Sequence, residues 1–189
     1  YFYFPAVSYF QSGTITPDMI EKLQSGGNML SVGSGDGSLE KLISKGFKID
    51  KERIVVSDIK LDPKLKEYGF RTYEFDMLEN WPDFNEKFDY ILFPESLGVA
   101  VLKIQGNPRT HRFYSMFEED TKKILKLEQP KHPEFFLDVV SQDVPVVNTK
   151  YDIFRKAVKN LKPDGEIRVR WGMSEEQQIA YVMLKFKTE

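Results

Sequence analysis

The sequence predicts an α/β protein with a mostly parallel sheet and helices on both faces. A short apolar run at 29–32 passes through three alternating glycines into a helical pattern. Further strand-like segments follow at 54–59, 72–77 and 88–93, and the first two contain an aspartate near their ends. Strands that alternate with helical patterns favour parallel pairing, because each crossover returns the chain to the same edge of the sheet.

The glycine segment is the first predicted strand-to-helix turn. Gly33, Gly35 and Gly37 let the backbone adopt positive φ angles and leave no Cβ in the way, so a ligand can approach the main chain closely. A dinucleotide loop would read Gly-x-Gly-x-x-Gly, whereas this loop reads Gly-x-Gly-x-Gly and has Asp36 at the fourth position. The turn is therefore typical of a ligand cradle, but not of a dinucleotide site.

The acidic residues near the strand ends extend this prediction. Asp58 lies near the end of the run 54–59 and 21 residues after Gly37 (58 − 37), where a carboxylate can accept both hydroxyls of a ribose. Asp76 lies near the end of the run 72–77, and the run 88–93 is apolar after Asp89. We expect these acids at the ligand-binding edge of the sheet.

The last forty residues predict how the sheet ends. Residues 150–160 have helical spacing, and 161–169 combine a Pro-Asp-Gly turn with a fifth strand. Residues 174–178 are expected to begin a short helix, and 179–186 to form either a single last strand or the continuation of that helix. The sheet is therefore expected to end one strand short, within one domain that spans 1–189.

The amino-terminal residues carry six aromatic side chains in the first ten positions. These either pack on the core or form a flap over the ligand cleft. Thr16 and Pro17 then predict a helix start, as N-cap and first helical residue, and Gly26 marks the helix end.

Together, the glycine loop, Asp58, Asp76, the run Phe88–Phe93 and the Leu-Lys-Pro-Asp-Gly turn resemble the class I S-adenosylmethionine-dependent methyltransferases. The resemblance covers about 28–103 and 150–171. It implies a Rossmann-like three-layer sandwich and S-adenosylmethionine as cofactor.

The resemblance also implies roles for individual residues. In that family the glycine loop holds the methionine part of the cofactor, the acid matching Asp58 binds the ribose, and the acid matching Asp76 faces the adenine amino group. The residues after these two acids enclose the adenine ring. The expected cofactor-binding residues are Ser31, Gly33, Ser34, Gly35, Gly37, Asp58, Ile59, Asp76, Met77 and Pro94.

One position departs from the family pattern. The family usually has Asp or Glu two positions before the first glycine, and this chain has Ser31. A serine can still form a hydrogen bond, but it cannot neutralise the ammonium group of the cofactor. On charge complementarity alone, Ser31→Asp is expected to tighten cofactor binding.

The segment after the fourth strand is the expected acceptor side. Glu95 matches the first glutamate of a pattern found in small-molecule methyltransferases, but Gly98 and Val99 stand where Glu and His would be. Glu95 is the candidate catalytic base, and its alternative role is to bond backbone amides beside the cofactor. His111 is the other candidate base. An insertion at about 103–148 leaves from this edge and is expected to shape the acceptor pocket.

Composition narrows the function further. The net charge of −2 and a pI near 5.9 favour a small-molecule or side-chain acceptor over nucleic acid. The chain has no cysteine, and His111 and His132 are far apart in sequence, so no catalytic metal is expected. No apolar run is long enough to cross a bilayer, so the expected location is cytoplasmic and not in a membrane.

The function that these observations predict is methyl transfer from S-adenosylmethionine by in-line attack on the sulfonium methyl. The alternative is a methyltransferase-like interaction domain without activity, which Ser31 and the altered segment 93–99 favour. A nicotinamide-dependent enzyme is disfavoured by the glycine spacing.

Overall fold

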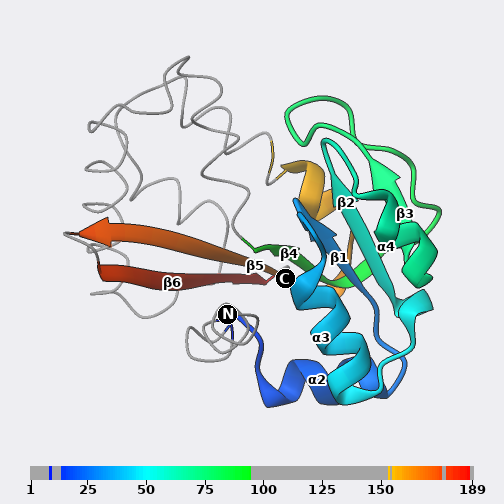
Figure 1. Ribbon diagram of the computed structural model, residues 1–189, viewed down its shortest axis with the longest axis horizontal. Helices are drawn as coiled ribbons and strands as arrows, with labels where there is room; N and C mark the ends of the chain where they lie inside the picture. The colour runs from blue at the N-terminus through cyan, green and yellow to red at the C-terminus, as the bar shows by residue number, and fades with distance from the viewer. Residues whose placement is uncertain (1–8, 10–13, 95–152, 154, 176–177, 188–189) are drawn as a thin grey trace.

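The computed structural model describes residues 9, 14–94, 153, 155–175 and 178–187. Its centre is a six-stranded sheet with the order β3-β2-β1-β4-β5-β6 (Figure 1). The strands are β1 (Met29–Val32), β2 (Ile54–Asp58), β3 (Arg71–Glu74), β4 (Phe88–Phe93), β5 (Leu161–Glu175) and β6 (Gln178–Lys187). The first five are parallel, and β6 is antiparallel to β5.

The helices begin and end where local chemistry favours it. They are α2 (Pro17–Gln24), α3 (Ser38–Phe47), α4 (Pro63–Tyr68) and a 3-10 helix, η1 (Lys51–Arg53), with further helical residues at 155–159. Pro17 is the first residue of α2 as predicted. The Asp62 carboxylate caps α4 by accepting from Lys64 N at 3.0 Å. The helix ends at Tyr68, and Gly69 follows as the C-cap with φ +105°.

Two apolar clusters lie on opposite faces of the sheet. Alternate residues of β1 divide between them, since Met29 belongs to one cluster and Leu30 to the other. Buried side chains of α2, α3 and α4 belong to the Met29 cluster. Ile153 and Ala157 belong to the Leu30 cluster. The predicted three-layer arrangement is confirmed.

Arg168 of β5 joins the sheet to the start of α2. Its side chain is fully buried and donates to Glu166 Oε2 at 2.8 Å, Thr14 O at 3.0 Å and Thr16 Oγ1 at 2.9 Å. Thr16 is the N-cap residue, but its hydroxyl accepts from Arg168 and does not cap the helix. The guanidinium also lies 5.0 Å from the ring centroid of Tyr90.

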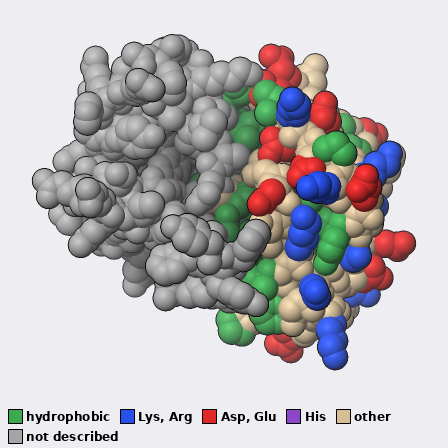
Figure 2. All heavy atoms as spheres, in the orientation of Figure 1, with side chains coloured by type: hydrophobic (Ala, Val, Ile, Leu, Met, Phe, Trp, Pro, Cys, Tyr) green, Lys and Arg blue, Asp and Glu red, His purple; other side chains and the backbone are tan. Residues whose placement is uncertain are grey.

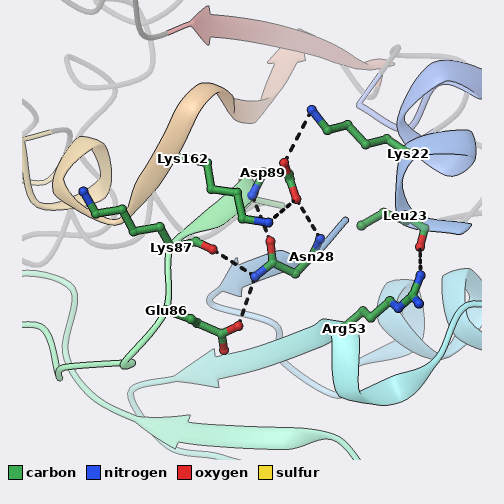
Figure 3. Close-up of polar contacts among 8 residues, drawn as sticks. All are labelled: Lys22, Leu23, Asn28, Arg53, Glu86, Lys87, Asp89 and Lys162. Atoms are coloured by element: carbon green, nitrogen blue, oxygen red, sulfur yellow. Dashed lines mark hydrogen bonds and ion pairs between the residues drawn. The ribbon is translucent and has the colours of Figure 1, made fainter. Parts of the chain in front are cut away.

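A second polar cluster aligns the amino ends of the central strands (Figure 3). Asp89 Oδ2 accepts from Asn28 N at 3.0 Å and from Lys162 Nζ at 2.8 Å, while Lys22 Nζ lies 3.4 Å from Oδ1. Burial acts to raise the pKa of Asp89, but the hydrogen bonds from Lys162 and Asn28 and the charges of Lys162 and Lys22 lower it. From its place in β4, the ionised Asp89 therefore links Asn28, which precedes β1, to Lys162 of β5.

Three sequence predictions differ from the structure. β3 ends at Glu74, so Asp76 and Met77 lie beyond the strand. β5 already begins at Leu161 and accommodates the predicted turn as an irregularity, with Asp164 at φ 63°. The predicted helix at 174–178 is wrong, because β5 extends to Glu175 and β6 begins at Gln178. Residues 179–186 belong to one last strand, which was one of the two expectations.

Several predictions lie outside the described residues. These concern Glu95, His111, His132, the insertion at 103–148 and the amino-terminal aromatic residues other than Tyr9, which is buried in the Met29 cluster. Within the described ranges, no helix combines the length and apolar character needed to cross a membrane.

Candidate functional site

The glycine loop joins β1 to α3 at the carboxyl edge of the sheet. Gly33, Gly35 and Gly37 all have positive φ angles of 77°, 58° and 71°, as predicted. Gly33 N and Ser34 N donate to Ser57 O at 2.8 and 2.9 Å. The first part of the loop is therefore fixed to the end of β2.

Gly35 connects the loop to the predicted ribose acid. Its N–H donates to Asp58 Oδ2 at 2.8 Å. A Cβ built on Gly35 would meet no atom of the described residues within 4 Å, so this part of the chain leaves the loop open here. At Gly37, by contrast, a Cβ would lie 2.2 Å from Leu65 Cδ2. Gly35 thus faces open space beside Asp58, whereas Gly37 is required for packing on α4.

Asp36 occupies the amino end of α3. Its carboxylate accepts from Ser38 N at 3.0 Å and from Ser38 Oγ at 2.7 Å. The hydrogen bond from the Ser38 hydroxyl lowers the pKa of Asp36, so the group is ionised near neutral pH. Because a carboxylate already occupies this helix end, the site does not suit a pyrophosphate.

The predicted adenine-side residues lie at the same edge. Phe75 N donates to Asp58 O at 3.0 Å, which brings the segment after β3 against the end of β2. Asp76 Oδ1 accepts from Leu78 N at 3.0 Å, and Met77 is partly buried against the core. Ile59 is a large apolar side chain that is left exposed, at 55%. An apolar surface is thus available next to Asp58.

Glu40 is a site residue that the sequence reasoning missed. It lies in the first turn of α3, is fully buried, and its Oε1 accepts a hydrogen bond from Ser31 Oγ. Its Oε2 has no hydrogen-bond partner among the described residues. The pKa of Glu40 is raised to about 7. Burial is the main cause, the hydrogen bond from Ser31 opposes it, and the charges of Asp36 and Asp58 add to it.

A periodicity signal could have found Glu40. It falls on the same helical stripe as the buried residues Ile43 and Ser44, three and four positions later. A charged residue at such a position is unusual and indicates a partner or a function. An acid at position 31 would face the Glu40 carboxyl, so the charge complementarity that favoured Ser31→Asp no longer holds.

Pro94 is the last described residue on the acceptor side. It is buried and directly follows β4, which pairs with β1 so that Leu92 is level with Ser31. The structure therefore brings Pro94 to the edge that carries the glycine loop. No group of three or more potential metal ligands occurs within the described part of the chain.

No protein-family model and no curated protein matches the sequence. Solved structures that match include a putative sarcosine dimethylglycine methyltransferase from Galdieria sulphuraria, with 15% identity over 85% of this chain and a TM-score of 0.47. The glycopeptide N-methyltransferase MtfA matches with 10% identity over 97% of this chain and a TM-score of 0.44. CalS10, an amino pentose methyltransferase from Micromonospora echinaspora, matches with 12% identity over 92% and a TM-score of 0.42.

The order of the strands decides the fold type. The parallel order β3-β2-β1-β4-β5, the glycine loop after β1 and the apolar clusters on both faces make up a Rossmann-like three-layer sandwich, which is the fold that the sequence resemblance implies. The chain has a Rossmann-like α/β fold. It spans 44%, 66% and 61% of the lengths of the three matched proteins.

Within this Rossmann-like fold, the strand order reverses between β1 and β4. Ligands of open α/β sheets bind beyond the carboxyl ends of the strands at such a point. The glycine loop follows β1, and Pro94 follows β4, so both lie at this switch point. The predicted residues that the structure describes are thus gathered at the expected edge of the sheet.

Proposed function

We propose that the protein binds S-adenosylmethionine at the carboxyl edge of the sheet and transfers its methyl group to a small-molecule or side-chain acceptor. The observation that carries this proposal is the hydrogen bond between Gly35 N and Asp58 Oδ2, which joins the glycine loop to the predicted ribose acid. The exposed Ile59 and the open space at Gly35 support a ligand at the same place.

The described residues fit this cofactor. The Asp58 carboxylate retains acceptor capacity for ribose hydroxyls, Ile59 offers an apolar surface to the adenine, and Asp76 offers a carboxylate to its amino group. When bound, S-adenosylmethionine supplies an electrophilic methyl group on a sulfonium. The protein itself would hold that methyl group in line with the acceptor, because positioning accounts for much of the rate in such reactions.

The test is calorimetric titration with S-adenosylhomocysteine and S-adenosylmethionine, with NAD as the control ligand. The first two are expected to bind and NAD is not, because Asp36 occupies the end of α3. Absence of heat and of a thermal shift at millimolar S-adenosylhomocysteine would contradict the proposal. Binding without methyl transfer to any small amine, hydroxyl or carboxyl acceptor would favour the interaction domain.

Asp58→Ala is the variant that tests the site itself. Loss of an ionised acceptor for ribose hydroxyls is expected to weaken S-adenosylhomocysteine binding by about 1.5–3 kcal/mol. Glu67→Ala, which removes an exposed acid of α4, is the matched control and is expected to leave the affinity unchanged. Equal affinities of wild type and Asp58→Ala would show that Asp58 does not hold the ribose.

A further inference from the structure

Glu40 has a buried carboxyl group, one oxygen of which accepts no hydrogen bond from the described residues. Ser31 Oγ donates to Oε1, and Oε2 has no hydrogen-bond partner among the described residues although it is fully buried. Buried polar atoms in folded proteins are normally paired, and an unpaired carboxylate oxygen is costly to bury. An unpaired buried oxygen of this kind indicates a ligand that completes its hydrogen bonding.

The position of the pair links it to the glycine loop. Ser31 lies two residues before Gly33, and Glu40 lies three residues after Gly37. The hydrogen bond between them therefore closes the base of the loop. The resemblance assigns this loop to the methionine part of the cofactor, which carries the ammonium group.

We propose that the carboxylate of Glu40 is the counter-charge for the ammonium group of the cofactor, with Oε2 as the acceptor atom. Glu40 thereby takes over the charge of the acid that the family has at the position of Ser31. The inference rests on the proposed function, because it requires that the loop holds an amino acid moiety. Ser31 acts as a positioning residue, since its hydroxyl fixes the other carboxyl oxygen.

The charged groups around Glu40 define how binding depends on pH. Asp36 from the loop and Asp58 from the end of β2 are both acidic, and together with burial they favour the protonated form of Glu40. A bound ammonium group has the opposite effect and favours the carboxylate. Binding near pH 7 is therefore expected to release a proton from Glu40 to solvent, and affinity is expected to rise from pH 6 to pH 8.

The experiment compares two ligands on two variants. S-Adenosylhomocysteine carries the ammonium group, whereas 5′-methylthioadenosine lacks the amino acid moiety. Glu40→Gln keeps the size of the side chain and an oxygen that can accept from Ser31, but it has no charge. At pH 8 it is expected to weaken S-adenosylhomocysteine binding about 10- to 100-fold and to leave methylthioadenosine binding unchanged. Glu21→Gln, an exposed acid of α2, is the matched control.

A second measurement uses the wild type alone and does not depend on the folding of a variant. Calorimetry in two buffers with different ionisation heats measures the protons released on binding. Release is expected near pH 7 with S-adenosylhomocysteine and not with methylthioadenosine. Absence of proton release, or equal weakening of both ligands by Glu40→Gln, would overturn the inference. Absence of S-adenosylhomocysteine binding to wild type would instead overturn the proposed function.

Discussion

Glu40 illustrates how a single buried residue can serve a ligand at the expense of the unliganded fold. Its carboxyl is fully buried, so ionisation near neutral pH is unfavourable in the absence of a cation. A residue selected for stability alone would be apolar or neutral at this position of α3. Retaining an acid there is a typical exchange of stability for binding.

This exchange predicts a pH-dependent difference in stability. The carboxyl ionises near 4.5 in the unfolded chain, whereas the folded pKa of Glu40 is about 7. Because the folded state holds the proton more tightly, the Glu40 contribution is fully present below pH 4.5 and is lost as the pH rises through 7. Without ligand, Glu40→Gln is therefore expected to gain about 2–4 kcal/mol in free energy of unfolding relative to wild type between pH 4.5 and pH 8.

Urea unfolding of both proteins at several pH values measures this difference directly. Glu21→Gln is again the control and is expected to follow the wild-type curve. Parallel curves for wild type and Glu40→Gln would show that the folded protein does not perturb Glu40.

At the scale of elements, Arg168 fixes α2 to the sheet. The guanidinium is fully buried against Glu166 and also bonds two groups of the segment before α2. Buried ion pairs contribute little net stability compared with apolar residues, but loss of one partner is costly. Arg168 therefore adds polar contacts to the docking of α2, whose apolar side chains pack in the Met29 cluster.

Arg168→Met is expected to lower the free energy of unfolding by about 3–5 kcal/mol, because Glu166 stays buried without the guanidinium. Thermal or urea unfolding measures the loss. The double variant Arg168→Met, Glu166→Gln is expected to recover part of the lost free energy of unfolding. Lys159→Met, at an exposed position, is the control. A change below about 0.5 kcal/mol in Arg168→Met, the usual range for surface positions, would contradict the assigned role.

The elements also show what the sequence could predict. The four parallel strands up to Phe93 were visible because their apolar runs are local signals, and Asp58 was visible because it ends one of them. The start of β5 at Leu161, before the Pro-Asp-Gly turn, was not visible, because the turn lies inside the strand as an irregularity in its pairing with β4. Glu40 was missed because its role arises only when α3 brings it against Ser31.

For the molecule as a whole, charge bears on the class of acceptor. The net charge is −2, and Figure 2 shows Lys and Arg side chains interspersed with Asp and Glu on the described part of the visible face. A protein that tracks a phosphate backbone needs basic side chains gathered along one path. On that part of the surface, the charges do not favour a nucleic acid partner.

We therefore expect no salt-sensitive binding to duplex RNA or DNA at micromolar protein concentration and about 150 mM salt. Fluorescence anisotropy with labelled duplexes measures this, and a repeat at low salt tests for weak electrostatic association. Submicromolar binding that weakens steeply with added salt would make a macromolecular acceptor the better hypothesis.

The cluster around Asp89 has a consequence for how this protein can change over evolution. Asp89, Asn28 and Lys162 hold the central strands in register at the edge opposite the glycine loop. The alignment of β1, β4 and β5 is therefore supported at the edge away from the glycine loop. Substitutions there can be sampled while the sheet keeps its alignment, so descendants of this chain can diverge in what they accept and still share one scaffold.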